Sequence, residues 1–320
     1  MNLIRWGLIA LTAFPGITVP AYPERPITMI VAFVPGGGTD VVARMLAPYL
    51  EKQLGPTARI VVVNRAGAGG EIGFTAIANA PADGYTIGFI NSPAVQAIPI
   101  ERPAARYSMQ SFDYIGNVVD DPASITVHAD APFKDLKELL AWAKANPGAA
   151  TTGTPGIATT GHLVITLIHK LTGIGLTHVP FKGTGDVKAA MAGRQIAVAA
   201  ISVGEAMQAI KGGTPVRILA QMGPTRSTLT PEVPTAKEQG VNVELGSLRG
   251  IAAPKGLPAD VREVLVKALE HAVADPEFRA KSVQYYAPLR YLSPMQFEVE
   301  LREAQVQMRM IWKESPWTDK

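Results

Sequence analysis

The stretch Val31-Ala32-Phe33-Val34-Pro35-Gly36-Gly37-Gly38-Thr39-Asp40 indicates how this chain folds. It overlaps an apolar, β-branched run at residues 27–34, which predicts a short buried strand. Apolar residues at helical spacing follow it: Val42, Met45, Leu46, Leu50 and Leu54. The sequence therefore predicts a strand, a glycine loop and the beginning of a helix.

Such a loop is suited to binding an anion. Glycines bring bare backbone N–H groups close to a ligand, and the first N–H groups of a helix lack partners within the helix. The partial positive charge of the helix start adds to this effect, so the loop favours a carboxylate or phosphate. The alternative from the residues alone is a tight turn capped by Thr39, with nothing bound.

Composition restricts the class of protein. The chain has 320 residues, of which 47% are apolar and 18% are charged, so it is globular and long enough for two domains. Its net charge is only +3, and no Lys/Arg cluster stands out, so we expect no nucleic-acid partner. The absence of cysteine excludes a thiol nucleophile, a cysteine metal site and disulfides.

The N-terminus resembles a secretory signal. Arg5 precedes an apolar run at residues 6–14, and Val19-Pro20-Ala21 supplies the small residues of a cleavage site. The run is too short to span a bilayer. We therefore expect residues 1–21 to be a signal peptide, cleaved after Ala21, and the mature protein to be exported and soluble.

The pattern of strand, glycine loop and helix recurs along the chain. Further loops lie at residues 64–73, 153–161 and 181–185. Alternating strands and helices predict an α/β fold with mostly parallel sheets, in which ligands bind at the carboxyl ends of strands. Because the loops near Gly37 and Thr159 lie far apart in sequence, we infer two lobes that each contribute a helix N-terminus to a shared cleft.

Two local patterns have simple structural readings. Asp120-Asp121-Pro122 predicts a turn between strands at residues 112–119 and 124–128. Ser293-Pro-Met-Gln296 is a capping box that predicts a C-terminal helix to about Trp312.

Catalytic and metal motifs are missing. No Gly-Lys-Ser/Thr follows the first loop, as a nucleotide phosphate site would require. The loop at residues 64–73 reads GxGxxxG, and no acidic residue follows the next strand. This pattern argues against a dinucleotide-binding site. No hydrolase string occurs, and the five histidines lack metal spacing. The simplest role for His162, at a helix start, is capping or packing. Because these motifs are missing, we predict that the protein is not an enzyme and binds no metal or cofactor.

Ordered motifs resemble the receptors of the tripartite tricarboxylate transporters, also called the Bug family. These motifs are Tyr22-Pro-Glu-Arg-Pro-Ile27, Pro35-Gly-Gly-Gly-Thr-Asp40, Asn64-Arg-Ala-Gly-Ala-Gly-Gly70, Ala82-Asp-Gly-Tyr-Thr86, Ala145-Asn-Pro-Gly148, Gly161-His-Leu163, His178-Val-Pro-Phe-Lys-Gly183 and Glu232-Val-Pro-Thr235. The resemblance covers nearly the whole mature chain.

The resemblance implies a periplasmic, type II-like binding protein with a ligand cleft between two lobes. It places lobe one at residues 22–121 plus 224–320 and lobe two at 122–223. Its ligands are small carboxylates, such as di- and tricarboxylates, acidic amino acids or aromatic acids. It also implies delivery to a membrane permease with one large and one small subunit. We expect a monomer.

The family's gripping elements fall on defined positions of this chain. The first-loop and cleft residues are Phe33, Pro35, Gly36, Gly37, Gly38, Thr39, Asn91, Ser92 and Phe181. The second loop is 156–162, with Gly156, Thr159, Thr160 and His162. Asp40 has a structural reading instead, because its carboxylate complements the helix dipole and would repel an anionic ligand.

Three departures from the family pattern affect the ligand. Ile201-Ser202 replaces an acidic residue and Asn, Leu248-Arg249-Gly250 replaces an aromatic pair before Gly, and Gly156-Ile-Ala158 replaces a more polar triplet. Ser202 stays a candidate ligand contact. Arg249 either meets a second acidic group of the ligand or lies on the surface. Ile201 removes a partner for an ammonium group, which favours a ligand other than an amino acid.

Two other functions remain open from the sequence. A receptor of this kind could pass its signal to a sensor partner in place of a permease. An enzyme could use the Gly37 loop as an anion hole, although no nucleophile supports that reading.

Overall fold

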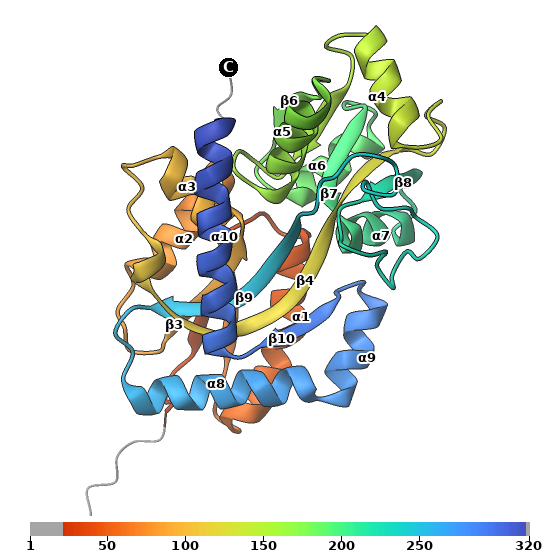
Figure 1. Ribbon diagram of the computed structural model, residues 1–320. Coiled ribbons are helices and arrows are strands. Elements are labelled where there is room, and N and C mark those ends of the chain that lie inside the picture. The colour runs from red at the N-terminus through yellow and green to blue at the C-terminus, as the bar shows by residue number, and fades with distance from the viewer. Residues whose placement is uncertain (1–21, 318–320) are drawn as a thin grey trace, which may run out of the picture.

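The computed structural model describes residues 22–317, so the predicted signal peptide lies outside the described residues. Within them, ten strands form one sheet in the order β2-β1-β3-β9-β4-β7-β5-β6, and β8 and β10 pair with β4 beside this path. The sheet crosses two lobes, with helices around each (Figure 1). The two-lobed α/β architecture is therefore confirmed.

The first lobe is built from both ends of the chain. Its N-terminal elements are β1 (Ile27–Val31), α1 (Gly38–Leu54), β2 (Ile60–Asn64), η1 (Ala68–Gly70), α2 (Glu71–Ala78), β3 (Thr86–Ser92), α3 (Ala94–Glu101) and η2 (Met109–Ser111). Its C-terminal elements are β9 (Gly246–Pro254), α8 (Ala259–Ala274), α9 (Pro276–Gln284), β10 (Leu289–Leu292) and α10 (Pro294–Glu314). The apolar faces of α1 and α8 pack against this part of the sheet, which explains the stripe after the glycine loop.

The second lobe is built from the middle of the chain. Its elements are α4 (Leu136–Ala145), β5 (Thr151–Thr154), α5 (Thr160–Thr172), β6 (Thr177–Pro180), α6 (Thr184–Ala192), β7 (Val198–Ser202), α7 (Val203–Lys211) and β8 (Val216–Gln221). The apolar faces of α4 and α5 form one core with β7 and β8.

A single long strand, β4 (Phe112–His128), runs through both lobes beside β9 (Figure 1). Residues 112–122 pair with β9, and residues 123–128 pair with β7 and β8. The predicted turn at Asp120–Asp121 is therefore wrong. Pro122 pairs with Gly246 within the strand, so tertiary pairing overrides the local turn signal.

The sheet is mixed, and its pairings correct the expectation of mostly parallel sheets. Strands β1, β2 and β3 pair in parallel, as do β5, β6 and β7. In contrast, β4 and β9 run antiparallel to each other and to their neighbours. The central antiparallel strands connect the two lobes.

The exact lobe boundaries stay a prediction. The first crossing, placed at 121/122, lies where β4 changes its pairing partners. After β8, however, Ala236, Val241 and Val243 pack in the core of the second lobe. This packing argues for a return to the first lobe near Gly246, later than the predicted 223/224.

None of the helices between residues 22 and 317 combines the length and apolarity that a bilayer crossing requires.

Candidate functional site

A small cavity of about 50 Å³ lies where four helix N-termini meet. Its wall includes Gly38 of α1, Thr160 of α5, Thr184 of α6 and Glu205 near the start of α7. Because α1 belongs to the first lobe and the other three helices to the second, the cavity lies between the lobes. Both Gly-rich loops that the sequence singled out contribute to it.

The first loop reaches the cavity through its last residues. Asp40 Oδ2 accepts the Gly36 N–H at 2.9 Å, and Asp40 Oδ1 accepts from Arg44 and Asn64. This arrangement confirms the structural reading of Asp40. Thr39 does not cap the helix, since its Oγ1 accepts from Asn91 Nδ2 at 2.8 Å, on the cavity wall.

The second loop places the N-terminus of α5 on the opposite wall. The hydroxyl of Thr159, the residue before α5, donates to the Gly156 carbonyl at 2.6 Å. It therefore holds the loop together. The half-buried Thr160 also lines the cavity, and its hydroxyl has no hydrogen-bond partner within residues 22–317. The first N–H groups of α5 likewise lack partners inside the helix.

Glu205 links the two lobes through its carboxylate. Its Oε2 accepts the Ser202 N–H at 3.0 Å in the capping box of α7. Its Oε1 accepts the Gly38 N–H at 3.1 Å and the Thr184 hydroxyl at 3.0 Å. A carboxylate of this chain thus occupies the N-terminus of α1, at the place predicted for an external anion.

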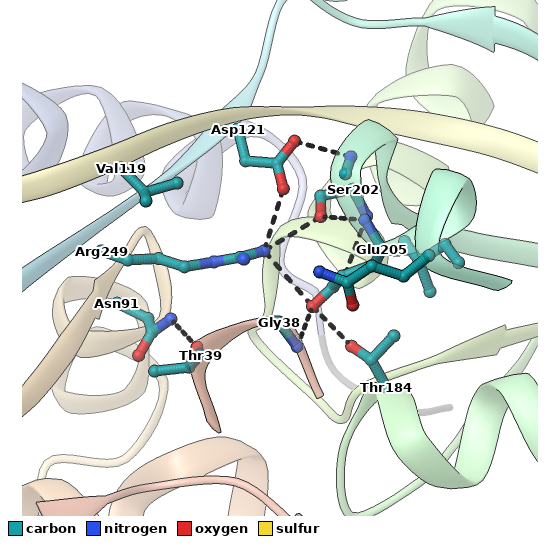
Figure 2. A network of polar contacts seen from close by, with 12 residues as sticks. Gly38, Thr39, Asn91, Val119, Asp121, Thr184, Ser202, Glu205 and Arg249 are labelled. Atoms are coloured by element: carbon teal, nitrogen blue, oxygen red, sulfur yellow. Dashed lines mark hydrogen bonds and ion pairs between the residues drawn. The ribbon is translucent and has the colours of Figure 1, made fainter. Parts of the chain in front are cut away.

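Arg249 extends from β9 into the same group of residues, as Figure 2 shows. Its Nη2 donates to Ser202 Oγ at 2.9 Å and lies 3.3 Å from Glu205 Oε1 and 3.4 Å from Asp121 Oδ2. Only 4% of Arg249 is exposed, so the alternative of a surface arginine is wrong. Its Nε is buried and has no hydrogen-bond partner among residues 22–317.

Burial and the charge of Arg249 shift the pKa values of Asp121 and Glu205 in opposite directions. Burial raises the pKa of Asp121 to about 6, although Arg249 opposes this rise, and the nearby Glu205 adds to it. Burial also acts to raise the pKa of Glu205, but Arg249 and its hydrogen bonds hold that pKa below its usual value. With a pKa of about 6, Asp121 is mostly ionised at pH 7, so both carboxylates face Arg249 as anions at neutral pH.

The lobes approach each other closely at three glycines, Gly38, Gly69 and Gly185. A Cβ on Gly38 would lie 2.3 Å from Arg249 Nη1 and 2.7 Å from Glu205 Oε1. A Cβ on Gly69 would lie 2.3 Å from the Ile157 carbonyl, and one on Gly185 would lie 2.8 Å from the Pro35 carbonyl. Beside them, Lys188 donates to the Gly36 carbonyl at 2.7 Å. These contacts hold the cleft closed.

The predicted site residues fall into two groups. Those on the cavity wall are Phe33, Gly37, Gly38, Thr39, Asn91, Thr159, Thr160, Ser202 and Arg249. Pro35, Gly36, Ser92, Gly156, His162 and Phe181 lie outside this wall. Gly156 and Phe181 line a separate groove between the lobes. His162 accepts the Ala158 N–H through Nδ1 and stacks on His178, so it supports the loop.

Sequence reasoning missed other residues of the wall. These are Ala94, Pro155, Thr184, Ala200, Ile201, Glu205 and Ser247, of which only Ile201 was considered for the ligand, whereas Gly161 lies within the predicted loop at residues 156–162. Glu205 carried a usable signal, because Ser202-x-x-Glu205 has the spacing of a capping box. Its bond to Gly38, 167 residues away, had no local signal.

Comparisons with known proteins identify the family of this chain. Residues 42–316 match the family model described as "Tripartite tricarboxylate transporter family receptor". The chain is 34% identical to the protein BugT of Bordetella pertussis over 284 residues, covering 85% of this chain and 86% of BugT.

Solved structures share the fold. The periplasmic binding protein BugD superposes with a TM-score of 0.85 at 33% identity, over 92% of this chain and 98% of BugD. MatC of Rhodopseudomonas palustris, solved with bound malate, has a TM-score of 0.83 at 25% identity, over 91% of this chain and 99% of MatC. A two-lobed fold, helix N-termini around one interlobe cavity and matches along nearly the whole described chain lead to one conclusion: this chain belongs to the tripartite tricarboxylate transporter receptor family.

Proposed function

We propose that this receptor binds one small organic carboxylate between its lobes. The observation that carries the proposal is the meeting of the α1 and α5 N-termini, one from each lobe, on a single cavity. Helix N-termini favour anions through their free N–H groups and dipoles. The malate found in MatC supports the same ligand class.

The ligand carboxylate would meet the free N–H groups and Thr160 of α5 on one side. Arg249 lines the cavity and is the cationic side chain on its wall within residues 22–317. Charge-assisted hydrogen bonds are strong where water is excluded. Contacts to both lobes would favour the closed form, and micromolar binding, about −8 kcal/mol, is a reasonable scale.

The receptor would deliver its ligand to a membrane permease with one large and one small subunit. Export to the periplasm would use the predicted signal peptide at residues 1–21. Uptake measured in a strain lacking the receptor tests the transport role. Normal uptake of every bound acid would favour the sensing role.

A thermal-shift panel of small acids and their primary amides tests the ligand class. A bound acid at 100 times its dissociation constant should stabilise the protein by about 2.7 kcal/mol, and the amides should not. Equal shifts from acids and amides would contradict the proposal.

Thr160→Val tests the contact on α5. This nearly isosteric change removes a hydroxyl that has no partner within residues 22–317, so the melting temperature should stay the same while acid affinity falls. Thr172→Val is the matched control, since Thr172 ends the same helix away from the cavity. Unchanged affinity in Thr160→Val would remove this side chain from the site.

A further inference from the structure

We propose that Glu205 makes this receptor selective for acids with a single carboxylate and excludes dicarboxylates from the cleft. The inference rests on the proposed function and narrows it. Its basis is that the chain's own carboxylate already occupies one of the two anion positions between the lobes.

Glu205 already occupies donors that a ligand carboxylate could use. Glu205 Oε1 accepts hydrogen bonds from the Gly38 N–H of α1 and the Thr184 hydroxyl, and it forms an ion pair with Arg249 Nη2. The α1 side of the cavity is therefore already supplied with a negative charge. The N-terminus of α5, at Thr160 and Gly161, has no side-chain cap, so its first N–H groups are available to a ligand carboxylate.

The charged side chains at the cavity do not balance a second ligand carboxylate. Arg249 is the one cationic side chain on the cavity wall within residues 22–317, and it faces two buried acids, Glu205 and Asp121. Glu205 is 6% exposed and Asp121 is 1% exposed, so water screens neither. One ligand carboxylate can face Arg249 on the wall, but a second would lie beside Glu205 with no further cation on the described wall to balance it.

The size and polarity of the cavity restrict the ligand further. A cavity of about 50 Å³ holds roughly four water-sized groups, so the ligand is compact. Asn91 also lines the cavity, and its buried Oδ1 has no hydrogen-bond partner among residues 22–317. A hydroxyl on the ligand would satisfy this acceptor. The cavity thus suits a short hydroxy acid with one carboxylate.

Matched pairs of acids test the selectivity. Butyrate with succinate, and 3-hydroxybutyrate with malate, differ by the exchange of one methyl group for a second carboxylate. Calorimetric titration should give at least tenfold tighter binding of the single acid in each pair. Tighter or equal binding of succinate and malate would overturn the inference while leaving the carboxylate receptor intact. If no acid binds and none shifts the melting temperature, the proposed function fails first.

Glu205→Gln tests the cause of the selectivity. Glutamine keeps the shape and the oxygen that accepts from Gly38, but it removes the charge and the acceptor of the Ser202 N–H. The ratio of diacid to single-acid dissociation constants should fall at least tenfold in this variant. Glu232→Gln makes the same charge change at an exposed position away from the cavity and should leave the ratio unchanged.

Asp121→Asn provides a second variant if Glu205→Gln folds poorly. It removes the charge behind Arg249 without touching the cavity wall, and it should move the ratio in the same direction. A ratio that stays within threefold of the wild-type value in the folded variants would overturn the role of these carboxylates.

Discussion

Glu205 of α7 accepts the N–H of Gly38 at the start of α1, at 3.1 Å, and so joins the two lobes at their shared cavity. The same oxygen lies 3.3 Å from Arg249 Nη2 (Figure 2). The site is therefore organised around an internal ion pair, and its properties follow from that pair.

Gly38→Ala should weaken ligand binding without unfolding the protein. The new Cβ would lie 2.3 Å from Arg249 Nη1 and 2.7 Å from Glu205 Oε1, so these side chains must move in the closed form. Overpacking of this kind costs about 1–3 kcal/mol, which corresponds to about a 5- to 150-fold loss of affinity. Calorimetry measures it, with Gly175→Ala as the control because its Cβ has 4.0 Å of clearance from His169. Equal affinities of the two variants would contradict the account.

Arg249→Met should strongly destabilise the fold. It leaves the buried carboxylates of Glu205 and Asp121 without their cation, and breaking a buried pair costs about 3–5 kcal/mol. Urea unfolding measures the change. Arg290→Met is the control, since Arg290 pairs with Asp120 and Glu300 at the surface, where such pairs contribute about 0–1 kcal/mol. Similar losses in both variants would show that the buried pair has no special weight.

Because of Asp121, the free energy of unfolding should fall as the pH rises from about 4 to 6. Burial raises its pKa in the folded protein to about 6 from 3.8, against the effect of Arg249. The folded state therefore holds a proton that the unfolded state releases, and this contribution is complete below about pH 4 and lost above pH 6. Two pKa units correspond to about 3 kcal/mol.

The comparison that isolates this effect is urea unfolding of the wild type and Asp121→Asn between pH 4 and 7. Asparagine does not titrate, so the wild type should lose stability relative to the variant as the pH rises. A constant difference across this range would mean that Asp121 titrates near its ordinary pKa.

Lys188→Met should loosen lobe closure. Lys188 on α6 donates to the Gly36 carbonyl at 2.7 Å, which joins the second lobe to the first loop. A hydrogen bond contributes about 0.5–1.5 kcal/mol, so ligand affinity should fall about 2- to 12-fold in calorimetric titrations. Lys211→Met, at the exposed C-terminal end of α7, should leave affinity unchanged. A loss of equal size in both variants would argue against a closing contact.

Local signals predicted much of this molecule. The glycine loop at residues 36–40, the start of α5 after Thr159 and the Ser293–Gln296 capping box of α10 depend on neighbouring residues, so the sequence reveals them. The ordered motifs then predicted the two-lobed fold and the family.

Long-range contacts account for what the sequence did not reveal. The run of β4 through Pro122 depends on pairing with Gly246, and the strand β9 itself was not predicted. Arg249 and Glu205 come together from β9 and α7, and only the folded sheet makes them neighbours. The internal carboxylate at α1 therefore had to be read from the structure.

The most direct test of the account is calorimetric titration of the wild type with the acid that stabilises it most and with that acid's primary amide. The two compounds differ chiefly in charge, so helix N-termini converging on an anion predict at least a 100-fold lower dissociation constant for the acid. Dissociation constants within threefold of each other would contradict the claim that this cleft recognises a carboxylate.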